Sequence, residues 1–153
     1  MVIEPFLKPE LVFSRPHART RDELFRLLAD RAAPLLPPVT PEQLLALLQA
    51  RERQGSTSTP EAVAFPHAVS PDIPTTALAV VTAEPGIEFS GSHPPATLIL
   101  CLFGSSLTPW EHVRLLARLS RIVAHGDARR RLLAAGGPND LLDALRAEDR
   151  SHG

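Results

Sequence analysis

The stretch ATLILCLFG, residues 96–104, is an almost unbroken run of apolar side chains with the length of a β-strand. A strand that faces water on one side alternates apolar and polar residues, whereas a strand covered on both faces has a continuous apolar sequence. We therefore expect residues 96–104 to form a strand of a sheet that carries helices on both of its faces.

Other strands are predicted on the N-terminal side of this stretch. TTALAVVTA, residues 75–83, is a second apolar run bounded by turn residues, and a short apolar segment leads into Phe65-Pro66. The connection EPGIEFSGSHPP, residues 84–95, is rich in proline, glycine and serine, with room for a short strand at residues 87–89.

Helices are predicted from their first residues. Thr20, Thr40 and Thr108 each stand three residues before a glutamate or glutamine, which is the spacing of a capping box. Apolar residues follow each of them with the period of a helix. Two shorter helices are expected over residues 127–135 and 139–147. The sequence thus predicts an α/β fold with a small sheet between helical layers, and a disordered tail over residues 149–153.

Composition excludes several classes of protein. The chain of 153 residues is long enough for one domain, and its formal net charge of −1 offers no surplus for binding nucleic acid. Its one cysteine, Cys101, excludes an intrachain disulfide and a cysteine-rich zinc site, and the histidines lack the spacing of zinc ligands. No apolar run approaches the roughly 20 residues of a membrane span. We expect a cytoplasmic domain without direct membrane insertion.

His67 is the first candidate functional residue. It follows Pro66, which lacks an N–H group and favours an extended or turning chain, so His67 is expected where a short strand ends. A ring in that place is held on one side and exposed on the other, as a nucleophile or a ligand requires. A surface histidine beside a turn is the alternative.

Two further polar residues fall on the inward faces of predicted helices. At about 100° per residue, Arg51 lies within about 20° of Leu44, whereas Arg53 points about 180° away. An inward arginine needs acceptors for its donors, so its partner is either an anion or the last carbonyl groups of its own helix. His112 lies in line with Leu115, either as a core histidine bonded to a carbonyl or as part of a site.

Three motifs occur in a fixed order: RE-x-x-GST at residues 51–57, PH at 66–67 and EH-x-x-LL-x-RL at 111–119. In this order they resemble the type-2 IIA domains of the bacterial phosphoenolpyruvate:sugar phosphotransferase system, the fructose, mannitol and nitrogen-regulatory class. The likeness extends over a domain of residues 1–148 and includes GIEF at 86–89, LARLSRI at 116–122 and RRLLAA at 130–135.

The resemblance implies a mixed sheet and the role of a phosphohistidine carrier. His67 corresponds to the histidine that accepts a phosphoryl group from the phosphocarrier HPr and passes it to a IIB partner or uses it as a regulatory signal. Arg51 and His112 correspond to residues beside that histidine, while Ser56 and Thr57 would supply hydroxyl donors to the phosphoryl group. No cofactor, metal or nucleic acid is implied.

One segment departs from the family pattern. Where the family carries a glycine-rich stretch of the form G-I-G-N-G, this chain has STPEA at residues 58–62. Glycines allow the backbone to approach a phosphoryl group closely, whereas Pro60 removes an N–H group and Glu61 adds a negative charge. A second hypothesis therefore stays open: a IIA-like regulatory or protein-binding module with weak or no phosphotransfer.

Overall fold

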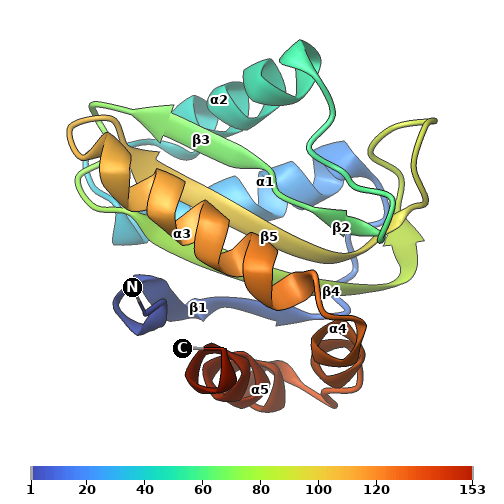
Figure 1. Ribbon diagram of the computed structural model, residues 1–153. Helices are drawn as coiled ribbons and strands as arrows, with labels where there is room; N and C mark the ends of the chain where they lie inside the picture. The colour runs from blue at the N-terminus through green and yellow to red at the C-terminus, as the bar shows by residue number, and fades with distance from the viewer. Residues whose placement is uncertain (1, 153) are drawn as a thin grey trace.

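A mixed β-sheet separates two layers of helices in the computed structural model, which describes residues 2–152 (Figure 1). Within that range the strands are β1 (Leu7–Ser14), β2 (Val63–Ala64), β3 (His67–Ser70), β4 (Ala77–Ile87) and β5 (Ala96–Ser105). The helices are α1 (Arg21–Ala32), α2 (Pro41–Gln54), α3 (Pro109–Val123), α4 (Gly126–Leu133) and α5 (Pro138–Ser151). The predicted fold class, α/β in one domain with helices on both faces of a small mixed sheet, is confirmed.

Strand β5 lies in the interior of the sheet. On one side it pairs with β4 in antiparallel orientation, and on the other it pairs with β2 and β3 in parallel orientation. Strand β1 is parallel to β4 at the far edge. The side chains of β5 alternate between a core under α1 and α2 and a core under α3, α4 and α5, in the order Leu98, Ile99, Leu100, Cys101, Leu102, Phe103. The continuous apolar run is thus explained by burial on both faces.

Strands β2 and β3 form one interrupted edge strand. The register of β2 against β5 continues unchanged in β3, where His67 pairs with Leu102. Between them Pro66 has no N–H group to donate, but its carbonyl accepts the N–H of Leu102 at 3.0 Å. His67 therefore begins a strand instead of ending one, and the prediction was wrong in this detail because pairing resumes immediately after the proline.

One strand was not predicted, and another is longer than predicted. Strand β1 was not predicted, because Lys8, Pro9 and Glu10 interrupt its apolar pattern, and the strand shifts its register against β4 over this stretch. Strand β4 continues to Ile87, beyond the predicted end at residue 83; of the short strand expected at residues 87–89, only Ile87 belongs to it.

The helix starts follow the sequence in two of three cases. Thr20 and Thr40 form complete capping boxes with the glutamate and glutamine three residues on. At Thr108 no capping box forms, because the residue leaves the extended conformation that a cap requires (ψ 63°). Its hydroxyl instead donates to the carboxylate of Glu111 at 2.8 Å.

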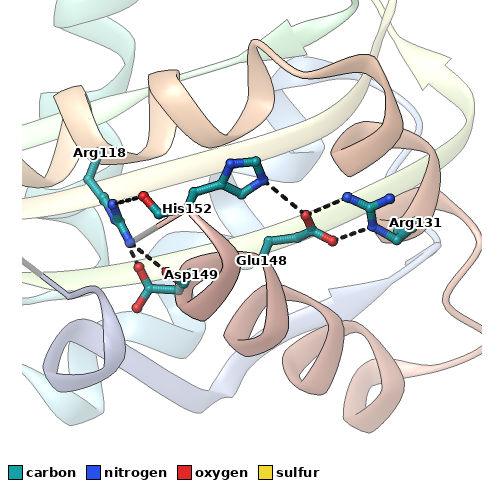
Figure 2. Close-up of polar contacts among 5 residues, drawn as sticks. All are labelled: Arg118, Arg131, Glu148, Asp149 and His152. Carbon is teal, nitrogen blue, oxygen red and sulfur yellow. Dashed lines mark hydrogen bonds and ion pairs between the residues drawn. The ribbon is translucent and has the colours of Figure 1, made fainter.

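Helix α5 contradicts the predicted C-terminal disorder. It continues to Ser151, and Asp149 is buried; of the predicted tail, Gly153 lies outside the described residues. Figure 2 shows Arg118 of α3 reaching across to the Asp149 carboxylate at 2.9 Å and to the carbonyl of His152 at 2.7 Å. The backbone N–H of Ile3 also donates to Asp149, at 3.0 Å. These partners are remote in sequence, so the polar segment at residues 147–153 could not reveal them.

A neighbouring ion pair completes this cluster. The guanidinium of Arg131 donates to both carboxylate oxygens of Glu148, at 2.5 and 2.8 Å, and holds the pKa of this carboxyl below its usual range (Figure 2). Glu148 is buried, so the arginine compensates a charge that would otherwise be costly in this position.

Among residues 2–152, none of the helices has both the length and the apolar character needed to cross a bilayer.

The segment that replaces the family's glycine-rich stretch is a tight turn. Two of its N–H groups are bonded locally: that of Ala62 donates to the Thr59 carbonyl at 3.2 Å, and that of Thr59 donates to the Val63 carbonyl at 2.8 Å. Ala62 adopts the left-handed backbone region with φ 63°. Its carbonyl accepts the N–H of Thr97 at 2.8 Å, which ties this conformation to the start of β5.

We predict that Ala62→Gly stabilises the protein. The left-handed region costs an L-residue roughly 1–2 kcal/mol, of which the greater freedom of glycine in the unfolded chain offsets roughly 0.5–1 kcal/mol. The remaining gain of up to about 1 kcal/mol should raise the melting temperature by roughly 2–4 °C in thermal denaturation. Ala117→Gly, on the exposed face of α3, is the matched control and should lower stability by about 1 kcal/mol. A decrease of similar size in both variants would contradict the prediction.

Candidate functional site

His67 lies at the edge of the sheet, beside the C-terminal end of α2. Its Nδ1 is 3.0 Å from the carbonyl oxygen of Phe65, and only a protonated ring nitrogen can donate to that oxygen. This bond puts the proton on Nδ1 and leaves the lone pair on Nε2. Nε2 in turn accepts a hydrogen bond from Nε of Arg51 at 3.0 Å, so both contacts require the same tautomer.

Arg51 occupies the last turn of α2 and meets one of the two alternatives expected for it, a carbonyl group at the end of its helix. Besides the bond to His67, its Nη1 donates to the carbonyl of Gly55, just beyond the helix, at 2.8 Å. Arg53 is exposed to solvent. The helical phase predicted for the two arginines is therefore confirmed.

His112 lies in the first turn of α3 and is half-buried. Its Nδ1 is buried without a hydrogen-bond partner among the described residues, which leaves Nε2 as the ring nitrogen free to bond. The ring packs closely against the end of β5, where a Cβ at Gly104 would stand 3.1 Å from the Cβ of His112. A glycine at position 104 is what allows this approach.

The surroundings of His67 favour its neutral form. Burial lowers the pKa of the imidazole below its usual range, and the charges of Arg51 and His112 lower it further. The hydrogen bond to the Phe65 carbonyl and the charge of Glu52 act in the opposite direction and do not outweigh them. The ring is therefore uncharged at neutral pH, which is the form that can act as a nucleophile.

Thr57 does not present a free hydroxyl to this site. Its hydroxyl donates to one carboxylate oxygen of Glu52 at 2.6 Å, and its N–H donates to the other at 2.9 Å. Both side chains are buried. The expectation that Thr57 donates to a phosphoryl group is not met here, because the proton is already engaged. Glu52 received no role from the sequence, although its spacing from Leu44 and Leu48 puts it on the buried face of α2.

Ser56 remains available. It is exposed and follows Gly55, whose carbonyl is bonded to Arg51. Arg51 thus connects the residue before Ser56 to the ring of His67. Arg51 is bonded to His67, the charge of His112 acts on the same ring, and Ser56 stands one residue beyond Gly55.

Exposed apolar side chains flank His112. Leu107, Trp110 and Val113 are 72%, 47% and 59% exposed, and they lie before and within the first turns of α3. We refer to these three as the α3 patch. Exposed apolar side chains grouped next to a reactive group are typical of a surface that contacts another protein. No group of three or more potential ligands suited to a metal occurs within residues 2–152.

The chain has relatives among known proteins. Residues 5–148 match the family model "Phosphoenolpyruvate-dependent sugar phosphotransferase system, EIIA 2". The chain is 30% identical over 130 residues to the 2-O-α-mannosyl-D-glycerate-specific EIIABC component of the phosphotransferase system of Escherichia coli, covering 82% of this chain. It spans only about a fifth of the length of that relative (20%).

Solved structures show the same fold. The nitrogen regulatory protein IIA-Ntr of Neisseria meningitidis superimposes with a TM-score of 0.86 at 19% identity, covering 94% of this chain and 98% of that one. The IIA mannitol enzyme of E. coli, in its complex with phosphorylated IIB, gives a TM-score of 0.77 at 19% identity, with 92% and 99% covered. The match of the family model over residues 5–148 shows that the chain belongs to the EIIA type 2 family of the phosphoenolpyruvate-dependent sugar phosphotransferase system.

Proposed function

We propose that this protein is a phosphohistidine carrier that accepts a phosphoryl group on Nε2 of His67. The observation that carries the proposal is the pair of hydrogen bonds on this ring. The Phe65 carbonyl fixes the proton on Nδ1, and Arg51 is bonded to the lone pair on Nε2. The lowered pKa keeps that lone pair free of a proton at neutral pH.

The transfer needs no change in the protonation of His67. The Nε2 lone pair attacks the phosphorus of a phosphohistidine on the donor protein, and the bond between that phosphorus and the donor's ring nitrogen breaks. The electron pair returns to the donor's imidazole. Arg51 must release Nε2 as the new bond forms, and its guanidinium then donates to the phosphoryl oxygens, where positive charge and fixed donors stabilise phosphoryl transfer. Nε2 of His112 and the hydroxyl of Ser56 are further donors.

The proposed partners are proteins. An HPr-like phosphocarrier would supply the phosphoryl group, and a IIB domain or a regulatory target would receive it. A IIA mannitol enzyme of the same fold forms a complex with phosphorylated IIB, which supports a IIB partner here. The α3 patch offers an apolar surface beside His112 for such a partner. Membership of this family and the single, buried cysteine support a cytoplasmic location.

A second candidate is a regulatory or protein-binding module with weak or no phosphotransfer. The observation in its favour is the turn at residues 59–62, whose N–H groups at Thr59 and Ala62 are bonded within the turn. They cannot also bind an anion, as the N–H groups of a glycine-rich loop can. The two candidates differ in whether His67 is labelled at a useful rate.

The first prediction for this function concerns the site of labelling. Incubated with phosphoenolpyruvate, enzyme I and HPr, the protein should gain one phosphoryl group that is lost in acid and stable in base, as measured by intact-protein mass spectrometry. His67→Ala should remove this label entirely, since the nucleophile is gone. His125→Ala is the matched control and should be labelled like the parent. Label that persists in His67→Ala would rule out the assignment.

The second prediction distinguishes two arginines that are two residues apart and on opposite faces of the same helix. Arg51→Ala should slow phosphoryl uptake by about 10²–10³-fold, because the loss of a positioned donor to the transition state costs about 3–4 kcal/mol. Arg53→Ala should change neither the rate nor the melting temperature, because its side chain is exposed. Rates from rapid-quench labelling give the comparison, and equal effects in the two variants would be incompatible with the proposed site.

The third prediction concerns His112. If Nε2 of this ring donates to the phosphoryl group, His112→Gln should keep part of the transfer rate, because its amide N–H can reach the place of Nε2, whereas His112→Ala should lose about 10-fold or more. Both variants should unfold within a few degrees of the parent, since Nδ1 makes no hydrogen bond in the folded protein. A large loss of stability with unchanged transfer per folded molecule would make His112 a core residue only.

A further inference from the structure

A line of three polar side chains leads away from the phosphoryl site. The hydroxyl oxygens of Ser56 and Ser58 are 2.7 Å apart, and Nδ1 of His93 is 3.3 Å from the Ser58 hydroxyl. Ser58 is buried and His93 is half-buried, whereas Ser56 is exposed. His93 comes from the connection between β4 and β5, remote in sequence from the two serines. We refer to these three residues as the Ser–His relay.

The exposed end of the Ser–His relay is connected to the reactive ring through Arg51 and Gly55. Arg51 bonds simultaneously to Nε2 of His67 and to the carbonyl of Gly55, the residue before Ser56. On the other side of Ser56, the carbonyl of Thr57 accepts the N–H of Phe65 at 3.1 Å. These bonds hold the backbone around Ser56 against the strand segment that carries His67.

The relay can run in two directions, which differ in what Ser56 offers an anion. If Nδ1–H of His93 donates to Ser58, then Ser58 donates to Ser56, and the Ser56 proton points outward. In the reverse direction Ser56 donates to Ser58, and no proton remains for an anion. The backbone N–H of Ser58 already donates to the Ser56 oxygen at 3.1 Å. In the first direction the Ser56 oxygen accepts two hydrogen bonds, one from the Ser58 hydroxyl and one from the Ser58 N–H. Ser56 can then interact with an anion only through its own hydroxyl proton.

We propose that His93 is a positioning residue of the phosphoryl site, whose Nδ1–H acts through Ser58 to turn the Ser56 hydroxyl proton toward the phosphoryl group on His67. The inference rests on the proposed function. It supplies a donor close in sequence to the turn at residues 59–62, where Pro60 has no N–H group and those of Thr59 and Ala62 are bonded locally.

The test is a cycle of variants of the full chain, with phosphorylated HPr as the donor and rapid-quench labelling as the measurement. His93→Ala and Ser56→Ala should each slow uptake by about 5- to 10-fold, the size of one hydrogen bond. The double variant should be no slower than Ser56→Ala alone, because both changes remove the same donor. His93→Asn should recover most of the rate, since its amide nitrogen can take the place of Nδ1. His17→Ala, exposed after β1 at the opposite edge of the sheet, is the matched control.

Each outcome decides between the proposals. Additive losses in the double variant, or an asparagine variant as slow as the alanine variant, would overturn the relay and leave the carrier function intact. A parent protein that takes up no phosphate would overturn the carrier function and the relay with it. Should His93→Ala not fold, ¹⁵N NMR of the phosphorylated parent gives the answer: a proton on Nδ1 of His93 supports the relay, and a bare Nδ1 overturns it.

Discussion

The burial of β5 on both faces is the constraint on which the rest of the molecule depends. Each large apolar side chain that it buries contributes about 1.5–3 kcal/mol, and such side chains follow one another without a break from Leu98 to Phe103. A strand of this kind needs neighbours on both edges and helices on both faces. The site follows from that arrangement, because His67 is paired opposite Leu102 and His112 packs on Gly104.

The chemistry of His67 is set by local and distant contacts together. The bond from Nδ1 to the Phe65 carbonyl spans only two residues, so it forms wherever the chain takes this path past Pro66. Arg51 belongs to α2, and its hydrogen bond to Nε2 identifies this nitrogen as the reactive atom. Burial and the neighbouring cationic groups disfavour a proton on Nε2 more strongly than the Phe65 carbonyl and Glu52 favour it, which is why the pKa is lowered. The same arginine that lowers the pKa is available for the phosphoryl oxygens.

The sequence predicted what depends on local pattern and missed what depends on distant partners. The apolar run of β5, the caps at Thr20 and Thr40 and the phase of Arg51 are all visible within one turn or one strand. The missed features were of another kind. The end of α5 is held by Arg118 and Ile3, and the hydroxyl of Thr57 is taken by Glu52. A sequence pattern can indicate that a side chain is polar and points inward, but the residue to which it bonds depends on the tertiary structure.

The turn at residues 59–62 contains a backbone conformation that usually calls for glycine, with an alanine in its place. Ala62 holds the left-handed conformation that glycine adopts most readily, because its carbonyl is bonded to Thr97 at the start of β5. The path is therefore imposed by pairing with β5. The N–H groups of Thr59 and Ala62 are bonded locally and Pro60 has none, so side chains become important as donors to a phosphoryl group. The guanidinium of Arg51 and the exposed hydroxyl of Ser56 are the side-chain donors proposed for this role.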